Sequence, residues 1–353
     1  MIRTESRADS KSEYPPSPIE SRRPPTPQQP VRTGKDLILA TQPYAKDQTA
    51  RSWWLLVSTA ILLMVVLSAT LWIPSLAGRF LASVLSGFMI LRLFVIYHDT
   101  QHNTILEKSR LAQGLMAMFG IWALSPSSIW RSSHNHHHNH NSKLRGSQIG
   151  SFPILTAAAF RETSRGEQRR YLASRHPLTL LFGYGPIFLY GMCLRPFLTR
   201  PKQHWDCVLA LILHVGIAVG LIVSSGWVTW LLFQTIPSLV ACALGSYLFY
   251  VQHNFPGVVF REKTTWTYEA AALESSSFLK LGPLMNWFTA NIGYHHVHHL
   301  NPHIPFYRLP EAMRRIPELQ SPRMVTLSLA DIIRCLRLKV WDNDLQRMTG
   351  VQR

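Results

Sequence analysis

Long apolar runs with few charges alternate with strongly polar, basic segments along this chain. A helix needs about 20 residues to cross a hydrocarbon core of about 30 Å. Four runs come close to or exceed this length, and they cover residues 53–73, 80–97, 207–223 and 227–250. Pro74 separates the first two runs and the short Ser224-Ser225-Gly226 segment separates the last two. The pattern therefore predicts two helical hairpins that span a membrane.

Two further apolar stretches do not fit a simple crossing. Residues 111–124 are too short, and residues 178–194 are interrupted by three glycines and by Pro186. We expect both stretches to lie in the membrane interface or to re-enter the membrane. Four crossings place every histidine cluster on one side, whereas a fifth crossing at 178–194 would separate the later clusters from the earlier ones.

The regions outside the apolar runs fit this topology. The chain carries 36 Lys and Arg against 19 Asp and Glu, a net charge of +17, and much of the excess lies in residues 102–175 and 195–204. Such basic loops face the cytoplasm in membrane proteins. We find no nucleic-acid-binding motif, so the expected partners of this charge are membrane lipids. Arg92, near the inner end of the second run, is expected to snorkel to the interface.

The two ends of the chain differ in character. Residues 1–45 are rich in Pro, Ser, Arg and Gln, so they are predicted to form a disordered basic tail. Residues 46–353 are predicted to form one membrane-bound domain. Within it, a helix is expected to start at Leu309, and a short amphipathic helix over residues 328–340 has Ser328 as its expected N-cap.

Histidines recur at ligand spacing in three clusters. Offsets of i, i+3 and i+4 place three imidazoles on one face of a helix, and imidazole is a common ligand of iron, zinc and copper. A single cluster of this kind equally indicates a solvated surface, but three clusters beside apolar runs favour a shared metal centre. The nine candidate ligands are His98, His102, His134, His137, His138, His253, His295, His298 and His299.

The ligand number indicates the kind of metal centre. Nine imidazoles are too many for one tetrahedral zinc and suit two metals. Iron is the favoured metal because non-haem iron with open positions activates dioxygen. Asp99, Asn254 and Asn291 lie beside the candidate ligands and are expected to orient imidazoles.

Some histidines fall outside this set. His136 and His140 form another i, i+4 pair, so the register of the second cluster stays open, and His296 and His303 are unassigned. His214, alone inside an apolar run, is expected to be a core histidine that binds no metal.

The segments HDTQH, SHNHHH, YVQHNF and NIGYHHVHHLNPHIPFYRLPEA occur in this order after apolar hairpins. In this arrangement, over residues 50–342, the chain resembles the membrane fatty acid desaturase family. The resemblance implies an all-α, four-helix membrane bundle with interfacial helices and a cytoplasmic, histidine-rich cap that binds two irons. His98 and His102 would belong to the first histidine box, His134, His137 and His138 to the second, and His295, His298 and His299 to the third. His253 would be an additional ligand, and no catalytic residue is implied beyond the ligands.

The implied activity is that of an oxidoreductase of fatty acid metabolism. It would use O2 and two electrons to introduce a cis double bond into a fatty acyl lipid or acyl-CoA. The chain contains no HPGG-type haem segment, so the electrons are expected to come from a separate ferredoxin or small b-type cytochrome. The expected location is a bacterial inner membrane, with both termini and the metal site on the cytoplasmic side.

Three other functions use parts of the same pattern. A related di-iron hydroxylase or ketolase acting on a lipid or carotenoid would add oxygen, whereas desaturation removes two hydrogens. A zinc-dependent membrane hydrolase would need about three ligands and no reductant. A histidine-rich metal-binding or transport protein would need polar residues along its spans, and apart from His214 these runs offer almost none.

Overall fold

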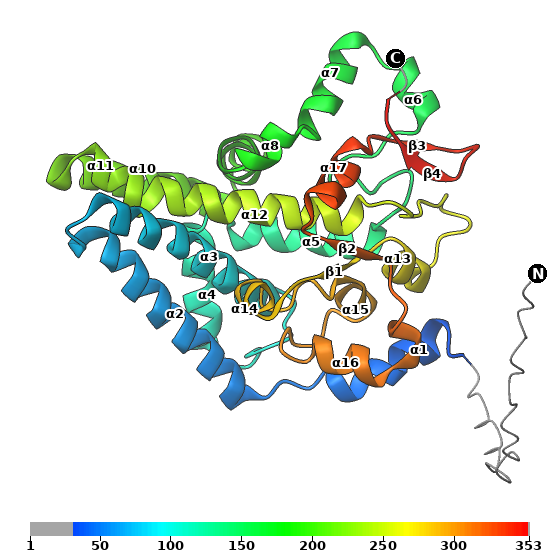
Figure 1. Cartoon of the computed structure of the whole chain (residues 1–353), viewed down its shortest axis with the longest axis horizontal. Coiled ribbons are helices and arrows are strands. Elements are labelled where there is room, and N and C mark those ends of the chain that lie inside the picture. Colours follow the sequence, from blue (N-terminus) through cyan, green and yellow to red (C-terminus); the bar gives the residue numbers. More distant parts are fainter. Residues whose placement is uncertain (1–30, 352–353) are drawn as a thin grey trace, which may run out of the picture. The chain divides into compact units, whose positions relative to one another are not determined.

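Four long apolar helices frame the protein in its computed structural model, which describes residues 31–351 (Figure 1). They comprise Thr49–Trp72, Leu76–Gln101, Trp205–Ser225 and Trp227–His253. Each is long and apolar enough to cross a membrane. The predicted fold class, an all-α membrane protein with four spans, is therefore confirmed.

The first hairpin joins α2 (Thr49–Trp72) to α3 (Leu76–Gln101). Pro74 has no backbone N–H to continue the helix, and Ser75 starts α3 by accepting a hydrogen bond from the Gly78 N–H at 3.1 Å. In its most apolar stretch α3 is 67% buried, against 28% for α2. α3 is thus the central helix, with α2 and the last span packed against it.

The second hairpin joins α10 (Trp205–Ser225) to a composite helix. Gly226 makes the turn with a φ of 83°, in the left-handed region that favours glycine. The helix then runs through α11 (Trp227–Trp230), the π-helical η3 (Leu231–Thr235) and α12 (Ile236–His253). Pro237 lacks a backbone N–H, which accounts for the widened turn just before it.

The two shorter apolar stretches form no spanning helix in the part of the chain that the structure describes. Residues 111–124 correspond to α4 (Arg110–Trp122). Residues 178–194 form α8 (Pro177–Leu181) and the π-helical η2 (Tyr184–Leu194), followed by α9 (Arg195–Thr199). The predicted number of spans is right, and the position of these helices in the interface stays a prediction.

Short elements complete the fold around the ends of α3 and α12. The helices are α5 (Ser127–His140), α6 (Ala157–Glu162), α7 (Arg165–Ser174), α13 (Tyr268–Glu274), α14 (Pro283–Phe288), α15 (His295–Leu300), α16 (Leu309–Arg315), η4 (Pro317–Leu319) and α17 (Leu329–Arg337). Strands β1 (Phe278–Lys280) and β2 (Met324–Thr326) pair in parallel, and β3 (Val340–Asp342) and β4 (Arg347–Thr349) pair antiparallel.

Two local predictions near the C-terminus are confirmed. α16 starts at Leu309, and the Ser328 hydroxyl caps α17 by accepting from the Asp331 N–H at 3.2 Å. α17 ends at Arg337 rather than at residue 340, because Val340 pairs with Thr349 in a strand.

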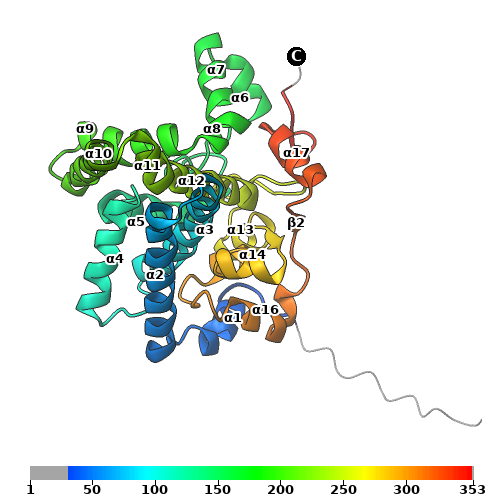
Figure 2. The ribbon, with the colours of Figure 1, turned by 60° about the vertical axis from the view of Figure 1, so that its left-hand side comes forward.

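The predicted disordered tail of residues 1–45 is wrong over its last part. α1 (Gly34–Thr41) and η1 (Gln42–Tyr44) form there and contact α13 and α16 respectively. Figure 2 shows α1 beside α16. Leu37 is fully buried, and the Thr41 hydroxyl accepts a hydrogen bond from Asn301 Nδ2 at 2.7 Å. These contacts with distant residues order the segment, whose apolar run from Leu37 to Ala40 differs from the Pro- and Ser-rich residues before it. The earlier part of the predicted tail, residues 1–30, lies outside the described residues, and the domain boundary stays a prediction.

Arg92 does not snorkel to the interface. Its side chain is only 4% exposed and lies over the Trp287 ring, 4.2 Å from the centroid. The guanidinium donates to Thr59 Oγ1 at 3.1 Å and to the backbone carbonyl of Trp287. Because Thr59 lies on α2 and Trp287 on α14, the buried guanidinium ties both of these helices to α3.

We expect Arg92→Lys to lower the free energy of unfolding by about 1–3 kcal/mol, because an ammonium cannot reproduce the planar contact with Trp287 or serve both acceptors. Denaturant unfolding in detergent, followed by tryptophan fluorescence, measures this change. Arg110→Lys, at an exposed position that starts α4, is the matched control. Equal stability of the two variants would contradict the role given to Arg92.

Candidate metal centre

Nine histidines from four parts of the chain converge at one end of the helical frame. α3 provides His98 and its C-cap residue His102, and α12 provides its last residue, His253. The other six come from the short helices α5 and α15, and they are His134, His137, His138, His295, His298 and His299. These are the nine residues that the sequence predicted as metal ligands.

The nine form two groups, in each of which one nitrogen from every histidine lies within 4.8 Å of the others. Group A comprises His98, His102, His134, His138 and His298, and group B comprises His137, His253, His295 and His299. α5 and α15 each contribute to both groups, because neighbouring positions on a helix point in different directions. The sequence predicted the residues but not this division.

Most of the Nε2 atoms within each group lie within 3.1 Å of another Nε2 of the same group. In group A, Nε2 of His134 lies 3.0 Å from Nε2 of His98 and 3.1 Å from Nε2 of His138. In group B, Nε2 of His253 lies 3.0 Å from Nε2 of His137 and 2.9 Å from Nε2 of His295. An imidazole nitrogen carries one proton or one lone pair, so neither His134 nor His253 can form two hydrogen bonds through one Nε2.

A cation at the centre of each group would satisfy these nitrogens. Two nitrogens about 2.1 Å from one ion are about 3.0 Å apart when they subtend a right angle, and about 3.4 Å apart at the tetrahedral angle. The observed separations of 2.9 to 3.1 Å match the right angle. The donor sets thus fit two ions of high coordination number better than tetrahedral zinc.

The charge state of the imidazoles also suits metal binding. Burial, reinforced by neighbouring histidines, holds the pKa of the α5 and α15 members well below 6.5. These histidines are therefore neutral at pH 7, the state in which imidazole offers a lone pair to a metal.

Three neighbours fix the orientation of individual rings. Asp99 Oδ1 lies 3.0 Å from His98 Nδ1, and its other oxygen accepts from the Phe306 N–H at 2.7 Å. Ser151 Oγ lies 2.5 Å from His137 Nδ1, and the Ser275 carbonyl lies 3.0 Å from His253 Nδ1. These contacts leave each Nε2 directed at its group. Sequence reasoning found Asp99 but missed the two serines, which lie far from the histidine boxes.

The two asparagines expected to orient imidazoles contact other groups instead. Asn254 Oδ1 accepts from Arg175 at 2.5 Å, and its Nδ2 donates to the Cys335 carbonyl at 2.8 Å. Asn291 donates to the Phe306 carbonyl at 3.2 Å. Both therefore hold backbone segments around the site, and the expectation that they contact imidazoles is wrong.

The remaining histidines of the boxes point away from both groups. His136 and His140 stack on each other, with ring centroids 4.0 Å apart, and His136 contacts the Gly146 carbonyl. His296 Nε2 lies 3.2 Å from the Leu319 carbonyl. The geometry of α5 thus favours the register His134, His137 and His138.

The start of α5 is held by a polar contact from α10. Asp206 accepts from the Ser128 N–H at 3.0 Å and from its hydroxyl at 2.5 Å, while His204 Nδ1 lies 2.8 Å from the same hydroxyl. A carboxylate at a helix N-terminus stabilises the helix. The carboxylate contacts the serine and not the histidine, which differs from a nucleophilic triad. This cluster therefore positions α5 and its ligands.

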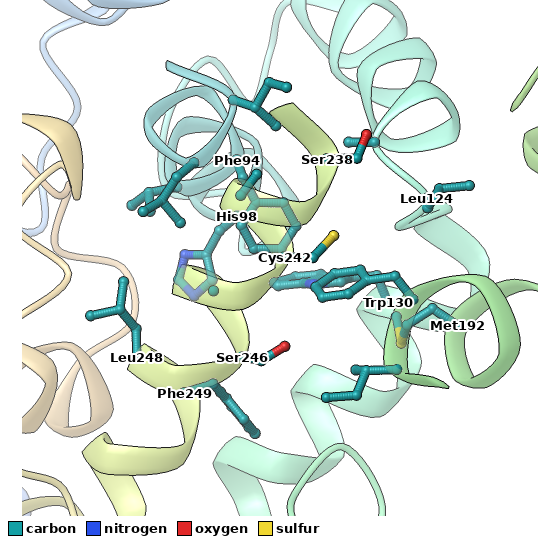
Figure 3. A pocket seen from close by; sticks show the side chains of 18 of the residues that line it. Phe94, His98, Leu124, Trp130, Met192, Ser238, Cys242, Ser246, Leu248 and Phe249 are labelled. Carbon is teal, nitrogen blue, oxygen red and sulfur yellow. The ribbon is translucent and has the colours of Figure 1, made fainter. Parts of the chain in front are cut away.

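A cavity of about 370 Å³ adjoins both groups. His98 and His134 of group A and His295 of group B line it. Figure 3 shows Phe94 and His98 on α3, Trp130 on α5 and Met192 on η2 around the face of α12 that carries Cys242 and Ser246. The walls are mainly apolar, so the cavity suits a hydrocarbon chain.

Comparison with known proteins agrees with this geometry. The family described as fatty acid desaturase matches residues 71–327. A fatty acid desaturase of Bacillus subtilis is 33% identical over 266 residues, which cover 75% of this chain and 74% of the relative.

More distant relatives have narrower names. An sn-1 acyl-lipid omega-3 desaturase (ferredoxin) of a Nostoc species is 25% identical, over 66% of each chain. An sn-1 oleoyl-lipid 12-desaturase of Anabaena variabilis is 24% identical over 80% of this chain and 81% of its own. The family match runs from the last two residues of α2 to just beyond β2 and includes all the histidine boxes. This chain therefore belongs to the fatty acid desaturase family.

Proposed function

We propose that this protein introduces a cis double bond into the acyl chain of a membrane lipid, using O2 and two electrons at a centre of two non-haem irons. The observation that carries the proposal is the convergence of nine imidazoles into two groups beside an apolar cavity. Membership of the fatty acid desaturase family favours iron as the metal that these imidazoles would bind.

The chain's own residues would hold and shield the metals. Group A would provide five imidazoles to one iron and group B four to the other. When bound, iron with an open position supplies activation of dioxygen, which allows attack on an unactivated C–H bond. Asp99, Ser151 and the Ser275 carbonyl would orient three of the ligands, and the apolar cavity wall would exclude water.

The cavity would position the substrate. Because histidines of both groups line it, an acyl chain inside it would lie beside both metals. The cavity lies among α3, α10, α12 and η2, so a lipid would enter from the bilayer more directly than a soluble carrier. Two relatives are named as desaturases of an acyl lipid and of an oleoyl lipid, and these names support a lipid rather than acyl-CoA as the substrate.

The electrons would come from a separate ferredoxin or small b-type cytochrome. One relative is named as using ferredoxin. Exposed arginines on α6 and α7, including Arg161, Arg165 and Arg169, offer a basic surface to an acidic protein.

The basic loops 102–175 and 195–204 favour a cytoplasmic position for the end of the protein that carries the histidine groups, in a bacterial inner membrane.

Expression in a host that lacks the activity tests the proposed reaction. Lipid profiling by mass and double-bond position should show products two hydrogens lighter than the saturated lipid, and formation should require oxygen. The metal content of the purified protein should approach two irons per chain. Gain of one oxygen in the product would indicate a hydroxylase, and one zinc with oxygen-independent activity would indicate a hydrolase.

His298→Ala should abolish desaturation and lower bound iron, because it removes one of the five imidazoles of group A. Iron per chain, measured on purified protein by mass spectrometry, is the readout. His140→Ala is the control, since that ring stacks on His136 outside both groups. Retained turnover and iron in His298→Ala would remove His298 from the site.

Asp99→Asn should weaken iron binding or activity by about 10–100-fold, because the amide holds the His98 ring less firmly than a carboxylate. Titration of the iron-free variant with Fe²⁺ measures the affinity. The change preserves the size of the side chain, so a matching loss of thermal stability would point instead to the Asp99 contact with the Phe306 N–H.

A further inference from the structure

His214 lines the cavity, whereas the sequence led us to expect a core histidine. It lies on α10, and its Nε2 contacts the hydroxyl of Tyr184 on η2. The same side chain lines the cavity that adjoins the two histidine groups. The Tyr184 contact fixes the ring and makes this patch of the wall polar.

Gln234 adds a second polar group at the same place. Its Nε2 donates to the His214 carbonyl at 2.8 Å, which ties η3 to α10. Gln234 is only 7% exposed and lines the cavity, and its Oε1 has no hydrogen-bond partner among the described residues. A buried acceptor without a partner is costly, so the wall is poorly suited to pure hydrocarbon at this point.

Gln234 lies in the part of the cavity that is remote from the nine candidate ligands, and it contacts His214 there. Gln252, beside His253, and Pro237 both line the cavity, and they lie about 22 Å apart along α12 at about 1.5 Å per residue. Gln234 precedes Pro237 and so lies still deeper. The cavity thus extends from the metal ligands over more than half of a hydrocarbon core of about 30 Å.

We propose that His214, held in place by Tyr184, and Gln234 form a polar floor that limits how long a chain segment can extend beyond the reacting carbons. This inference rests on the proposed function, in which an acyl chain occupies the cavity. A methyl end pressed against the floor would keep water from Gln234 Oε1, whereas a shorter chain leaves space for a water that donates to it. The floor therefore selects acyl chains by length without taking part in the chemistry.

His214→Ala, which removes the ring from the floor, tests the inference. Cells that express each variant receive saturated fatty acids of increasing length, and products are profiled by mass. His214→Ala should accept longer chains, with the ratio of longer to shorter product rising about tenfold for each added methylene that the cavity newly admits. Val215→Ala, on the adjacent exposed position of α10, should keep the wild-type length profile.

A second variant covers the case in which His214→Ala does not accumulate. Gln234→Leu keeps the approximate size of the side chain but removes the unpaired acceptor, so it should also shift the profile toward longer chains. Tyr184→Phe should give a smaller shift in the same direction, because it only releases the His214 ring. Tyr190→Phe, exposed on the same helix η2, is its control.

Acyl lipids that copurify with each protein separate the two possible failures. If wild-type protein carries no acyl lipid and forms no unsaturated product, the proposed function fails. If the wild type binds and desaturates acyl chains but folded His214→Ala and Gln234→Leu keep its length profile, the floor does not set chain length. Unchanged iron content in both variants would confirm that any shift arises in the cavity and not at the metals.

Discussion

The structure depends on bringing nine imidazoles together so that their nitrogens gather around two common centres. Such an arrangement is unfavourable by itself, because buried polar nitrogens have lost water and face one another instead of hydrogen-bond donors. A cation in each group would convert this cost into binding energy. The folded chain therefore has to hold the groups together rigidly, and the surrounding helices are arranged to do so.

Long helices provide that rigidity for two of the four ligand-bearing segments. His98 lies in the last turn of α3 and His253 ends α12, so both are fixed by helices long enough to cross a bilayer. α5 and α15 are too short to be stable alone and depend on tertiary contacts. Asp206 holds the start of α5, while α13 and α16 pack against α15. The candidate metal site thus connects the long helices α3 and α12 to the short helices α5 and α15.

Sequence patterns predicted those features of the fold and of the site that follow from helical periodicity or from adjacency in the chain. The four spans, the nine histidines and the contact between Asp99 and His98 were all within reach, because periodicity and adjacency determine them. The division into groups A and B could not be predicted from the sequence, because it depends on how α5 and α15 cross in space. Asn254 is adjacent to a ligand yet contacts Arg175, and Ser151 is distant from the boxes yet contacts His137. Such pairings require three-dimensional packing.

Polar residues within the spans differ in what satisfies them. Arg92 has Thr59, the Trp287 carbonyl and an aromatic face, and Arg79 donates to the Thr70 carbonyl and to Thr229. These contacts are internal, so both charges serve to fasten helices to one another. The side-chain oxygen of Gln234, in contrast, has no hydrogen-bond partner among the described residues. Gln234 lines the cavity that also reaches the candidate metal ligands. An unpaired group is a reason to infer contact with a ligand or water, whereas a paired one is fully explained by the fold.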